Sequence, residues 1–526
     1  MSMTTIRTER EAKFEGSGVF DPEALRGLPG VARIREEVAE ELDALYYDTA
    51  DLRLLTHGIT LRRRRGGHDA GWHVKMPKPQ AHRGNREIHA PLKAGKAGAV
   101  PPELARRLAA FARGGPLTPV AHVRTHRRRH VLLDKKGRPL AEVAQDRVAA
   151  QVLGTERLGA AAKKDSADTS TRLTHWFEIE VELEDGGPRL LDAAARRLAD
   201  AGWYPSPSAH KLDHTLAEEL PAARERAGGS RRKVRPGSAG EAIMRRLDQQ
   251  VSALLDLDPG VRADEADALH GMRTASRRIR NLLRSHRRLL DRDRTEPVIR
   301  ELAWLTSLLA PARDHEVLAD RLPAHMLRLG PEHRAAARRI GKQERERHDT
   351  AWRTAVLALD EPRYFALLDA LDALRADPPL RRRARKPALA QLSKAAARDH
   401  RRLARRIAAA QAAPAGEERD LALHAARKAA RRVRHTAETA LPYAGKRARR
   451  LRKRAKAVQQ VLGEHQDAVV ARAALPTLAV DAHRAGANTF AYGLLRARQD
   501  DLAERAGRAL PHVWHKARKR RLTRLT

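Results

Sequence analysis

The sequence contains no cysteine, and this absence removes three kinds of chemistry. A chain without thiols forms no disulfides, holds no metal through thiolates and uses no cysteine nucleophile. The opening stretch MSMTTIRTEREAKF lacks the apolar core of a secretory signal peptide. No run of about 18 apolar residues occurs either, and a membrane-spanning helix needs about that length. We therefore expect a soluble, cytoplasmic protein without a membrane span.

Aromatic residues and standard ligand-binding motifs are also scarce. Phe, Trp and Tyr make up only 3% of the chain, whereas proteins that bind single-stranded nucleic acid stack bases on aromatic side chains. The sequence has neither a Walker-type glycine-rich loop nor an HExxH motif, so nothing supports a P-loop nucleotide site or a zinc protease. No helical stretch mixes Asn or Gln with Arg in the way that major-groove readers often do.

Positive charge is what the sequence has in excess. It contains 104 Lys and Arg against 66 Asp and Glu, which gives a net charge of +38. Such a charge implies a polyanionic partner, and nucleic acid, an anionic membrane surface and polyphosphate are the candidates. A genome bias toward Ala and Arg also produces basic chains and would account for part of the excess.

The chain changes character near residue 220. Before it, short alternating segments are separated by Gly, Pro and Asp, which is typical of strands. After it, long segments rich in Ala, Leu and Arg predict helices. The stretch AARERAGGSRRKVRPGSAG lies between them. We predict an α+β multidomain protein with a strand-rich domain at 1–219, a flexible linker at 220–238 and an all-helical domain at 239–526.

The helical half contains two copies of one basic motif. The order His-x-x-Arg-x-x-x-Arg-Arg-x-Arg begins at His270 and again at His424. An aspartate follows each copy, at Asp314 and Asp467, at offsets that agree within one residue, and we expect these aspartates to orient arginines. Repetition of this kind indicates an internal duplication. Its two repeats would cover about 239–410 and 411–526.

On a helix the cations of each copy fall on one face and the apolar side chains on the opposite face. A solvated basic face is one interpretation. However, like charges three and four residues apart repel one another, and the stripe of the first copy contains no acid over four turns. A bound polyanion would relieve this repulsion, and a stripe about 20 Å long suits a chain of phosphates. The predicted binding residues are His270, Arg273, Arg277, Arg280 and Arg284 in the first copy and His424, Arg427, Arg431 and Arg434 in the second.

The strands of the N-terminal half also separate charged from apolar residues. In FEIEVEL, alternation places Glu178, Glu180 and Glu182 on one face and apolar residues on the other. Arg62 and Arg64 share a face in ITLRRR. One interpretation is a sheet with a solvated face. The other is a barrel with a charged interior, in which Lys and Arg hold phosphate oxygens and carboxylates hold Mg²⁺ or Mn²⁺.

These segments resemble the CYTH superfamily, also called triphosphate tunnel metalloenzymes. The opening Glu9-x-Glu11-x-Lys13 is similar to the family signature ExExK. YYDTADLRLLTHGITLRRRRGG resembles its Tyr-x-Asp-Thr and Leu-Arg-x-Arg segment, and WHVKMP, NREIHAPL, LAEVAQDRV and FEIEVEL follow in the family order. The resemblance implies an antiparallel eight-stranded β-barrel tunnel that hydrolyses a triphosphate by metal-assisted attack of water.

The resemblance also implies roles for individual residues, in a site where positioned cations provide much of the catalysis. Metal would be bound by Glu9, Glu11, Glu178, Glu180 and Glu182. Catalytic roles fall to Glu9, Glu11, Lys13 and Asp146. Substrate would be held by Arg62, Arg64, Lys75, Arg124, Arg127 and Lys211. The general base is left open among Asp146, Glu142 and Glu178.

The duplicated helices resemble the CHAD domain, the conserved histidine α-helical domain, whose members bind inorganic polyphosphate and can locate to polyphosphate granules. The two resemblances together imply a metal-dependent hydrolase of inorganic triphosphate or short polyphosphate, with Mg²⁺ or Mn²⁺ as cofactor and a polyphosphate-binding helical bundle attached. It would act in the cytoplasm or at such granules. The first alternative is a polyphosphate-binding protein without catalysis, and the second is a protein that binds nucleic acid.

Overall fold

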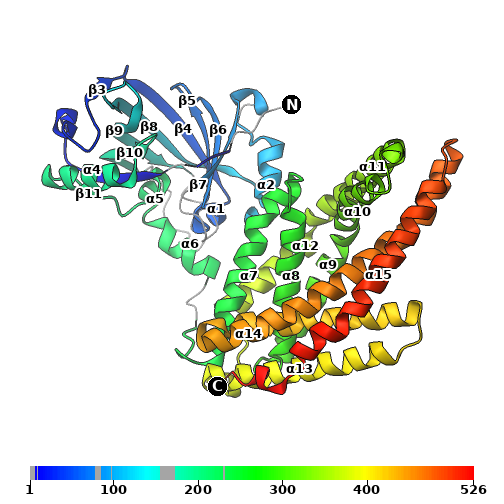
Figure 1. Cartoon of the computed structure of the whole chain (residues 1–526). Coiled ribbons are helices and arrows are strands. Elements are labelled where there is room, and N and C mark those ends of the chain that lie inside the picture. Colours follow the sequence, from blue (N-terminus) through cyan, green and yellow to red (C-terminus); the bar gives the residue numbers. More distant parts are fainter. Residues whose placement is uncertain are drawn as a thin grey trace. The chain divides into compact units, whose positions relative to one another are not determined.

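The computed structural model describes residues 6–8, 10–77, 85–95, 98–153, 172–228 and 232–525. The chain forms two compact units, Met1–Ser230 and Arg231–Thr526 (Figure 1). The boundary corrects the expected linker at 220–238, because its first part lies in helix α6 (Glu219–Gly228). Leu220 and Ala223 of α6 are buried in the core of the first unit, so this stretch is held in place by apolar packing.

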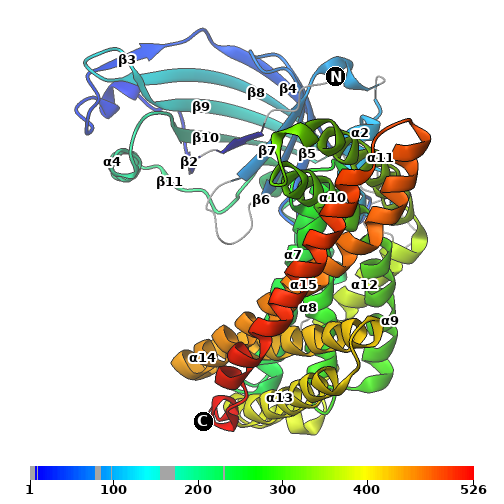
Figure 2. The same ribbon diagram turned by 45° about the vertical axis from the view of Figure 1, so that its right-hand side comes forward.

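The first unit is built on one antiparallel sheet. Its hydrogen-bonded order is β1-β7-β6-β5-β4-β8-β9-β10-β2-β11, with β3 paired to β8. The long strands β8, β9 and β10 run side by side and curve together (Figure 2). The strands are β1 (Ile6–Thr8), β2 (Glu11–Gly16), β3 (Arg33–Glu36), β4 (Glu40–Asp48), β5 (Thr60–Arg65), β6 (Gly71–Pro77), β7 (Asn85–Ala90), β8 (Thr118–Leu133), β9 (Pro139–Val152), β10 (Leu173–Leu183) and β11 (Tyr204–Pro205).

This sheet differs from the expected eight-stranded closed barrel. It contains 11 strands, and over the described residues its path is open between β1 and β11. The N-terminal segment nevertheless contacts both ends of the path, because β1 pairs with β7 and β2 pairs with β10. The strand pairing therefore shows an antiparallel sheet whose first segment bonds to both flanks, and the described residues do not show it closed into a barrel.

Helix α4 (Pro188–Asp200) packs on the apolar face of the sheet. Ile179 and Val181 of β10 are fully buried and pack with Leu190 and Leu198 of α4. This is the face that alternation in FEIEVEL predicts to be apolar. The helices of this unit are α1 (Arg53–Thr56), α2 (Pro102–Ala112), α4 (Pro188–Asp200), α5 (Lys211–Thr215) and α6, with 3-10 turns η1 (Pro22–Leu25) and η2 (Leu92–Ala94).

The second unit is helical throughout its described residues. Its helices are α7 (Ala239–Arg262), α8 (Ala268–Ser285), α9 (Arg292–Leu308), α10 (Ala310–Leu327), α11 (Arg334–Leu359), α12 (Pro362–Ala376), α13 (Ala388–Ala412), α14 (Glu417–Arg484) and α15 (Phe490–Ala517). Three 3-10 turns, η3 (Pro331–His333), η4 (Arg382–Arg385) and η5 (Arg520–Thr523), complete it. None of the helices described in either unit is both long enough and apolar enough to span a membrane.

Helix α14 is two helices joined by a kink. Gly445 has φ 43° and ψ −114°, outside the helical range, and glycine reaches this positive φ without steric cost. The first segment carries the second copy of the basic motif, and α8 carries the first. The second segment runs beside α15 (Figures 1 and 2). The kinked helix packs against both α13 and α15.

Candidate functional site

The charged face of the sheet encloses a cavity of about 170 Å³. Its lining mixes cations and carboxylates from β2, β4, β5, β6, β8, β9 and β10. The lining residues are Glu11, Lys13, Glu40, Leu42, Tyr46, Thr60, Arg62, Arg64, His68, Asp69, Lys75, Glu87, Arg127, Arg129, Glu142, Glu180, Glu182, Glu184, His210 and Lys211. Alternation therefore sends the charged faces of these strands into one enclosed space, as the second interpretation of the pattern requires.

The predicted phosphate-binding cations of β5 and β6 meet in this cavity. Arg62, Arg64 and Lys75 all line it, because β5 and β6 pair with Thr60 opposite Lys75. Burial, together with the neighbouring Arg62 and Arg127, lowers the pKa of Arg64 to about 9. A bound anion would offset this repulsion, since an opposite charge favours the charged form.

The register of β8 decides which of its arginines face the cavity. Arg127 and Arg129 line it, and Arg129 donates to Glu40 at 3.1 Å and to Glu142 at 3.3 Å. Arg124 has the opposite parity and points away from the cavity. Its side chain is 72% exposed and lies 3.8 Å from Asp43. The expected substrate contact of Arg124 is thus wrong, and Arg129 is the residue that the sequence analysis missed.

Lys211 joins three carboxylates beneath the cavity. Its Nζ lies 2.5 Å from Glu178 Oε1, 2.9 Å from Asp146 Oδ2 and 3.0 Å from Glu180 Oε1. Burial lowers the pKa of Lys211, but these three carboxylates outweigh it and raise the pKa overall. Lys211 also lines the cavity, so its ammonium group borders the space while being held by carboxylates.

Asp146 and Glu178 are placed behind the cavity lining. Asp146 is fully buried, and Arg127 donates to both of its oxygens, at 2.7 and 2.6 Å. Burial would raise the pKa of Asp146, but Arg127 and Lys211 outweigh it and lower the pKa. Glu178 is buried and also accepts from Trp176 Nε1 at 2.8 Å. In this structure both carboxylates orient Arg127 or Lys211. The catalytic role of Asp146 and the metal role of Glu178 stay predictions.

Three carboxylates form a row across the cavity side of the sheet. Glu182 stands opposite Glu11 on β2 and opposite Glu142 on β9. Like charges directly opposite one another are unfavourable in a sheet, and carboxylate oxygens are the ligands that Mg²⁺ takes. The row therefore fits a divalent cation. Glu9, the other expected ligand of the N-terminal signature, lies outside the described residues.

A second group of carboxylates fits a metal less well. Oxygens of Asp146, Glu178 and Glu180 lie within 4.8 Å of one another. However, Lys211 already contacts all three of these side chains. Glu180 is also bound by Lys13 at 2.7 Å and by Arg127 at 2.8 Å. These cations outweigh burial and bring the pKa of Glu180 well below its usual range. A metal there would compete with three ammonium or guanidinium groups.

The helical unit has a larger cavity of about 650 Å³, between α8, α10 and α14. Basic residues from both copies of the motif line this one cavity, as the duplication predicts. They are His270, Arg273, Arg277 and Arg280 of α8 and His424, Arg427, Arg431 and Arg434 of α14. Arg284 is the exception and corrects the prediction, because it is exposed at the last turn of α8, beyond the cavity.

Charge repulsion between the two copies is visible in the helical cavity. Burial, together with Arg273 and Arg427, lowers the pKa of Arg277 to about 10. Burial likewise lowers the pKa of Arg431 to about 9, with Arg277 and Arg427 as the next causes. Arginines of one copy thus lower the pKa of arginines in the other. The two helices share one electrostatic environment that favours an anion.

The two aspartates lie where the sequence analysis places them. Arg273 donates to Asp314 at 3.3 Å, and Arg427 lies 3.8 Å from Asp467. His424 bonds Gln466 through Nδ1. Burial and nearby cations lower the pKa of both His270 and His424. Both imidazoles are therefore shifted toward the neutral form.

Fold and cavities together define a two-unit protein, an antiparallel sheet with a cavity of cations and carboxylates followed by a helical bundle with a shared basic cavity. The chain matches the CYTH domain over residues 7–215 and the CHAD domain over residues 245–476. It is 37% identical over 501 residues to uncharacterized proteins of two Mycobacterium tuberculosis strains, and the alignment covers 94% of this chain and 94% of theirs. The chain therefore belongs to the CYTH–CHAD proteins.

Two solved structures are similar to about half of the chain. PptA from Streptomyces chartreusis has 25% sequence identity and a TM-score of 0.46, and the match covers 53% of this chain and 99% of that one. The CHAD domain from the plant Ricinus communis has 27% identity and a TM-score of 0.41, with 53% and 92% covered.

Proposed function

We propose that the N-terminal unit is a metal-dependent hydrolase of inorganic triphosphate or short polyphosphate, and that the C-terminal unit binds polyphosphate. The observation that carries this proposal is the composition of the sheet cavity. Cations of β5, β6 and β8 face a row of in-register carboxylates of β2, β9 and β10. A triphosphate with a divalent cation has the charges that complement this lining.

Substrate binding falls to the cations that line the cavity. Arg62, Arg64 and Lys75 hold phosphate oxygens from one side, and Arg127 and Arg129 hold them from β8. Arg127 and Arg129 are oriented beforehand by their bonds to Asp146 and Glu142. Donors fixed before the reaction stabilise the charge that develops in the transition state without reorganisation.

Mg²⁺ or Mn²⁺ would be held by Glu11 and Glu182, with Glu180 beside them. The bound ion would polarise a phosphoryl oxygen and offset negative charge on it. Lys13 lies 2.7 Å from Glu180 and 3.9 Å from Glu11. Lys13 therefore pairs chiefly with Glu180, whose other oxygen is bound by Arg127, so Glu11 and Glu182 are the carboxylates that we assign to the metal.

Glu142 is the group that we assign to the attacking water. Of the three carboxylates considered as general base, Glu142 alone lines the cavity. Arg127 and Lys211 lower the pKa of Asp146, which makes it a weak base. Glu178 is buried and held by Lys211, and it does not line the cavity. Among the described residues, Glu142 has one charged partner, Arg129, at a longer distance of 3.3 Å.

Polyphosphate binding by the helical unit is supported by the shared cavity of α8 and α14. Arginines of both copies surround one concave space, which suits a flexible chain of phosphates. Duplex nucleic acid, which offers a continuous convex surface, fits such a space poorly. We expect the protein to act in the cytoplasm or at polyphosphate granules.

A binding protein without catalysis is the second candidate. The close contacts of Lys13, Lys211 and Arg127 with Glu180 favour it, because they neutralise a carboxylate that metal binding needs. In this second candidate function, the sheet cavity would bind short polyphosphate without hydrolysing it.

Phosphate release from a panel of substrates separates the two candidates. The panel contains inorganic tripolyphosphate, thiamine triphosphate, ATP and longer polyphosphate, each with Mg²⁺, with Mn²⁺ and with EDTA. We expect metal-dependent release from tripolyphosphate or short polyphosphate and none with EDTA. Tight binding of tripolyphosphate without release under any condition would favour the binding protein.

A further inference from the structure

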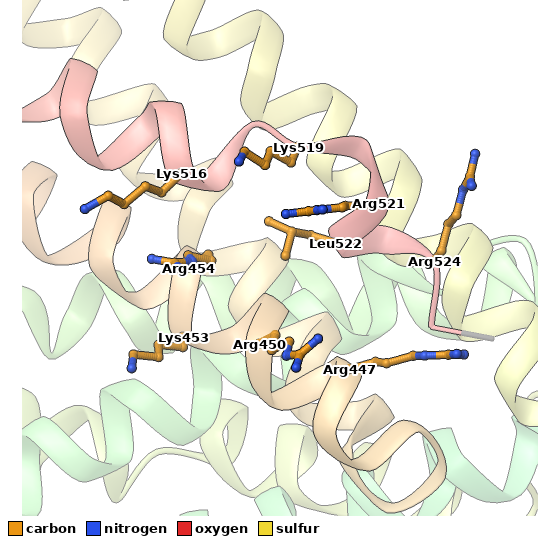
Figure 3. A pocket seen from close by; sticks show the side chains of 9 residues that line it. All are labelled: Arg447, Arg450, Lys453, Arg454, Lys516, Lys519, Arg521, Leu522 and Arg524. Atoms are coloured by element: carbon orange, nitrogen blue, oxygen red, sulfur yellow. The ribbon is translucent and has the colours of Figure 1, made fainter.

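A second basic pocket lies in the helical unit, at the C-terminal end of the described chain. Its volume is about 550 Å³. Two segments far apart in sequence form it, the start of the second segment of α14 and the end of α15 with η5 (Figure 3). The lining residues are Arg447, Arg450, Lys453 and Arg454 from the first, and Lys516, Lys519, Arg521, Leu522 and Arg524 from the second.

This pocket is separate from the cavity shared by α8 and α14. Arg450 and Gln459 differ by nine residues, so at 100° per residue they lie on opposite sides of the helix, roughly 180° apart. Gln459, Gln466 and Val470 line the shared cavity, whereas Arg450 lines the second pocket. Residues 516–524 also lie beyond the CHAD match, which ends at residue 476.

Apolar packing brings the two basic segments together. Leu451 and Ala455 of α14 share a buried cluster with Ala517 and Leu525. His400 Nε2 also bonds the carbonyl oxygen of Ala517 at 2.8 Å. The terminal segment is thus anchored on the helix, and its cations are held against those of α14. Figure 3 shows Arg521 and Leu522 across from Arg450 and Arg454.

The pocket contains no acid to balance these charges. The sequence has no Asp or Glu between Glu438 and Glu464, and none after Glu504. Within the described chain, no ion pair joins any of the eight lining cations to a carboxylate. Charges held close together without counter-charges repel one another, so an anion that enters the pocket is bound by cations already gathered for it.

We propose that this pocket is a second binding site for a linear phosphate chain, and that its ligand is inorganic polyphosphate. Polyphosphate carries a charge on every phosphate unit and no base between them, which matches cations packed into a small concave space. A nucleic acid strand carries one charge per nucleotide, spaced about 3.4 Å along the axis in a duplex, and its bases favour aromatic surfaces. None of the lining residues is aromatic.

The existence of this site does not depend on hydrolysis in the sheet cavity. The choice of polyphosphate among phosphate chains rests on the function proposed for the helical unit. A long polyphosphate chain held by both sites would have a higher affinity than a chain held by either site alone, because the second contact is intramolecular.

Arginine footprinting of the full-length protein tests the site directly. Phenylglyoxal modification of each arginine is followed by peptide mass spectrometry, with and without polyphosphate, in the wild type and in Arg277→Gln/Arg431→Gln. We expect polyphosphate to protect Arg450, Arg454 and Arg521 at least about threefold in both proteins, since the pocket does not need the shared cavity.

A matched pair of variants tests the contribution of the pocket to binding. Arg450→Gln/Arg521→Gln removes two lining cations, and Arg405→Gln/Arg406→Gln removes two exposed cations of α13 outside it. A plot of log K against log salt falls with a steep slope when many cations contact phosphate. Only the first variant is expected to make this slope less steep, by about one for each arginine removed.

The outcomes distinguish this proposal from the proposed function. If the pocket arginines lose their protection in Arg277→Gln/Arg431→Gln, the pocket is not an independent site. If they stay protected while the arginines of the shared cavity are unprotected in the wild type, the function proposed for that cavity fails and the pocket stands. Equal effects of the two double variants, or stronger protection of the pocket by duplex DNA at the same salt, would overturn the polyphosphate assignment.

Discussion

At the scale of single residues, carboxylates in the sheet unit act in two ways that depend on their partners. Glu11, Glu142 and Glu182 form a row that faces the cavity, while Asp146 and Glu178 lie behind it and hold Arg127 and Lys211. Substitutions in the two groups should therefore have different consequences. The first group should affect metal binding and turnover, and the second the placement of cations.

Glu11→Gln should abolish metal-dependent phosphate release with little loss of thermal stability. The change removes one charge from the row and keeps the shape of the side chain, so metal affinity falls while packing is retained. Release of phosphate from tripolyphosphate and the thermal midpoint are measured together. Glu41→Gln is the control, because Glu41 is 79% exposed on the opposite face of its strand. Full activity of Glu11→Gln would remove Glu11 from the metal site.

Arg129→Gln should raise KM for tripolyphosphate about ten- to a hundredfold, because a charged hydrogen bond to phosphate contributes about 1.5–3 kcal/mol. Arg124→Gln, five residues earlier on the same strand, should leave KM unchanged, since its side chain points away from the cavity. Steady-state kinetics of the two variants test the register of β8. Equal effects would show that the strand is placed wrongly.

Asp48→Ala should destabilise the sheet unit by about 3 kcal/mol or more. The Asp48 carboxylate is fully buried and accepts from the backbone N–H groups of Thr49, Leu54 and Leu55 at 2.7–2.9 Å. Each donor left unpaired in the interior costs about 1–3 kcal/mol. Calorimetry should show a lower midpoint for the sheet unit, and Asp48→Asn should lose less because its amide oxygen still accepts. A midpoint unchanged in Asp48→Ala would rule out this role.

At the scale of elements, the alternation of charged and apolar residues predicted which side chains of a strand face the cavity when only one face of that strand is charged. FEIEVEL and ITLRRR have apolar residues on one side, so burial determines which way Glu180 or Arg62 points. Strand β8 has basic residues on both faces, and its register is set by pairing of Arg127 with Glu40 on β4 and Asp146 on β9. Those partners are distant in sequence, so Arg124 and Arg129 could not be told apart beforehand.

The expected linker and the basic stripe of α8 also show that local sequence pattern does not reveal tertiary packing. Glycine, serine and charge predicted a flexible segment from residue 220, but Leu220 and Ala223 find a buried site only in the folded unit. Helical periodicity placed Arg284 on the basic stripe of α8, but it gives no information about where the cavity ends. Local pattern defines faces, and tertiary packing defines the extent of a site.

The two basic helices should contribute similarly to binding of long polyphosphate. Arg273→Ala/Arg277→Ala removes lining cations of α8, and Arg427→Ala/Arg431→Ala removes their equivalents on α14. Because both sets face one cavity, each double variant should weaken long-chain binding by a similar factor. Tripolyphosphate, which one helix can span, should be affected less. If one double variant binds long chains like the wild type, only the other copy is a site.

At the scale of the whole molecule, the net charge of +38 should appear in the salt dependence of polyphosphate binding. Log K should fall linearly with log salt, with a slope of about −0.7 for each phosphate contacted if the chain behaves like single-stranded nucleic acid. Titrations at several salt concentrations give this slope. A slope near zero would mean that charge does not drive binding.

The same titrations separate specific binding from attraction by net charge alone. A uniformly basic surface would bind duplex DNA and polyphosphate alike at matched salt. Concave sites that gather arginines from two helices should prefer the flexible chain, because it can follow the cavity while a duplex contacts only its rim. We therefore expect polyphosphate to displace DNA at equal phosphate concentration, and the preference to shrink in Arg277→Gln/Arg431→Gln. If DNA competes equally in the wild type, the two basic helices bind nucleic acid as well as polyphosphate. The repeated motif then defines a general anion-binding surface.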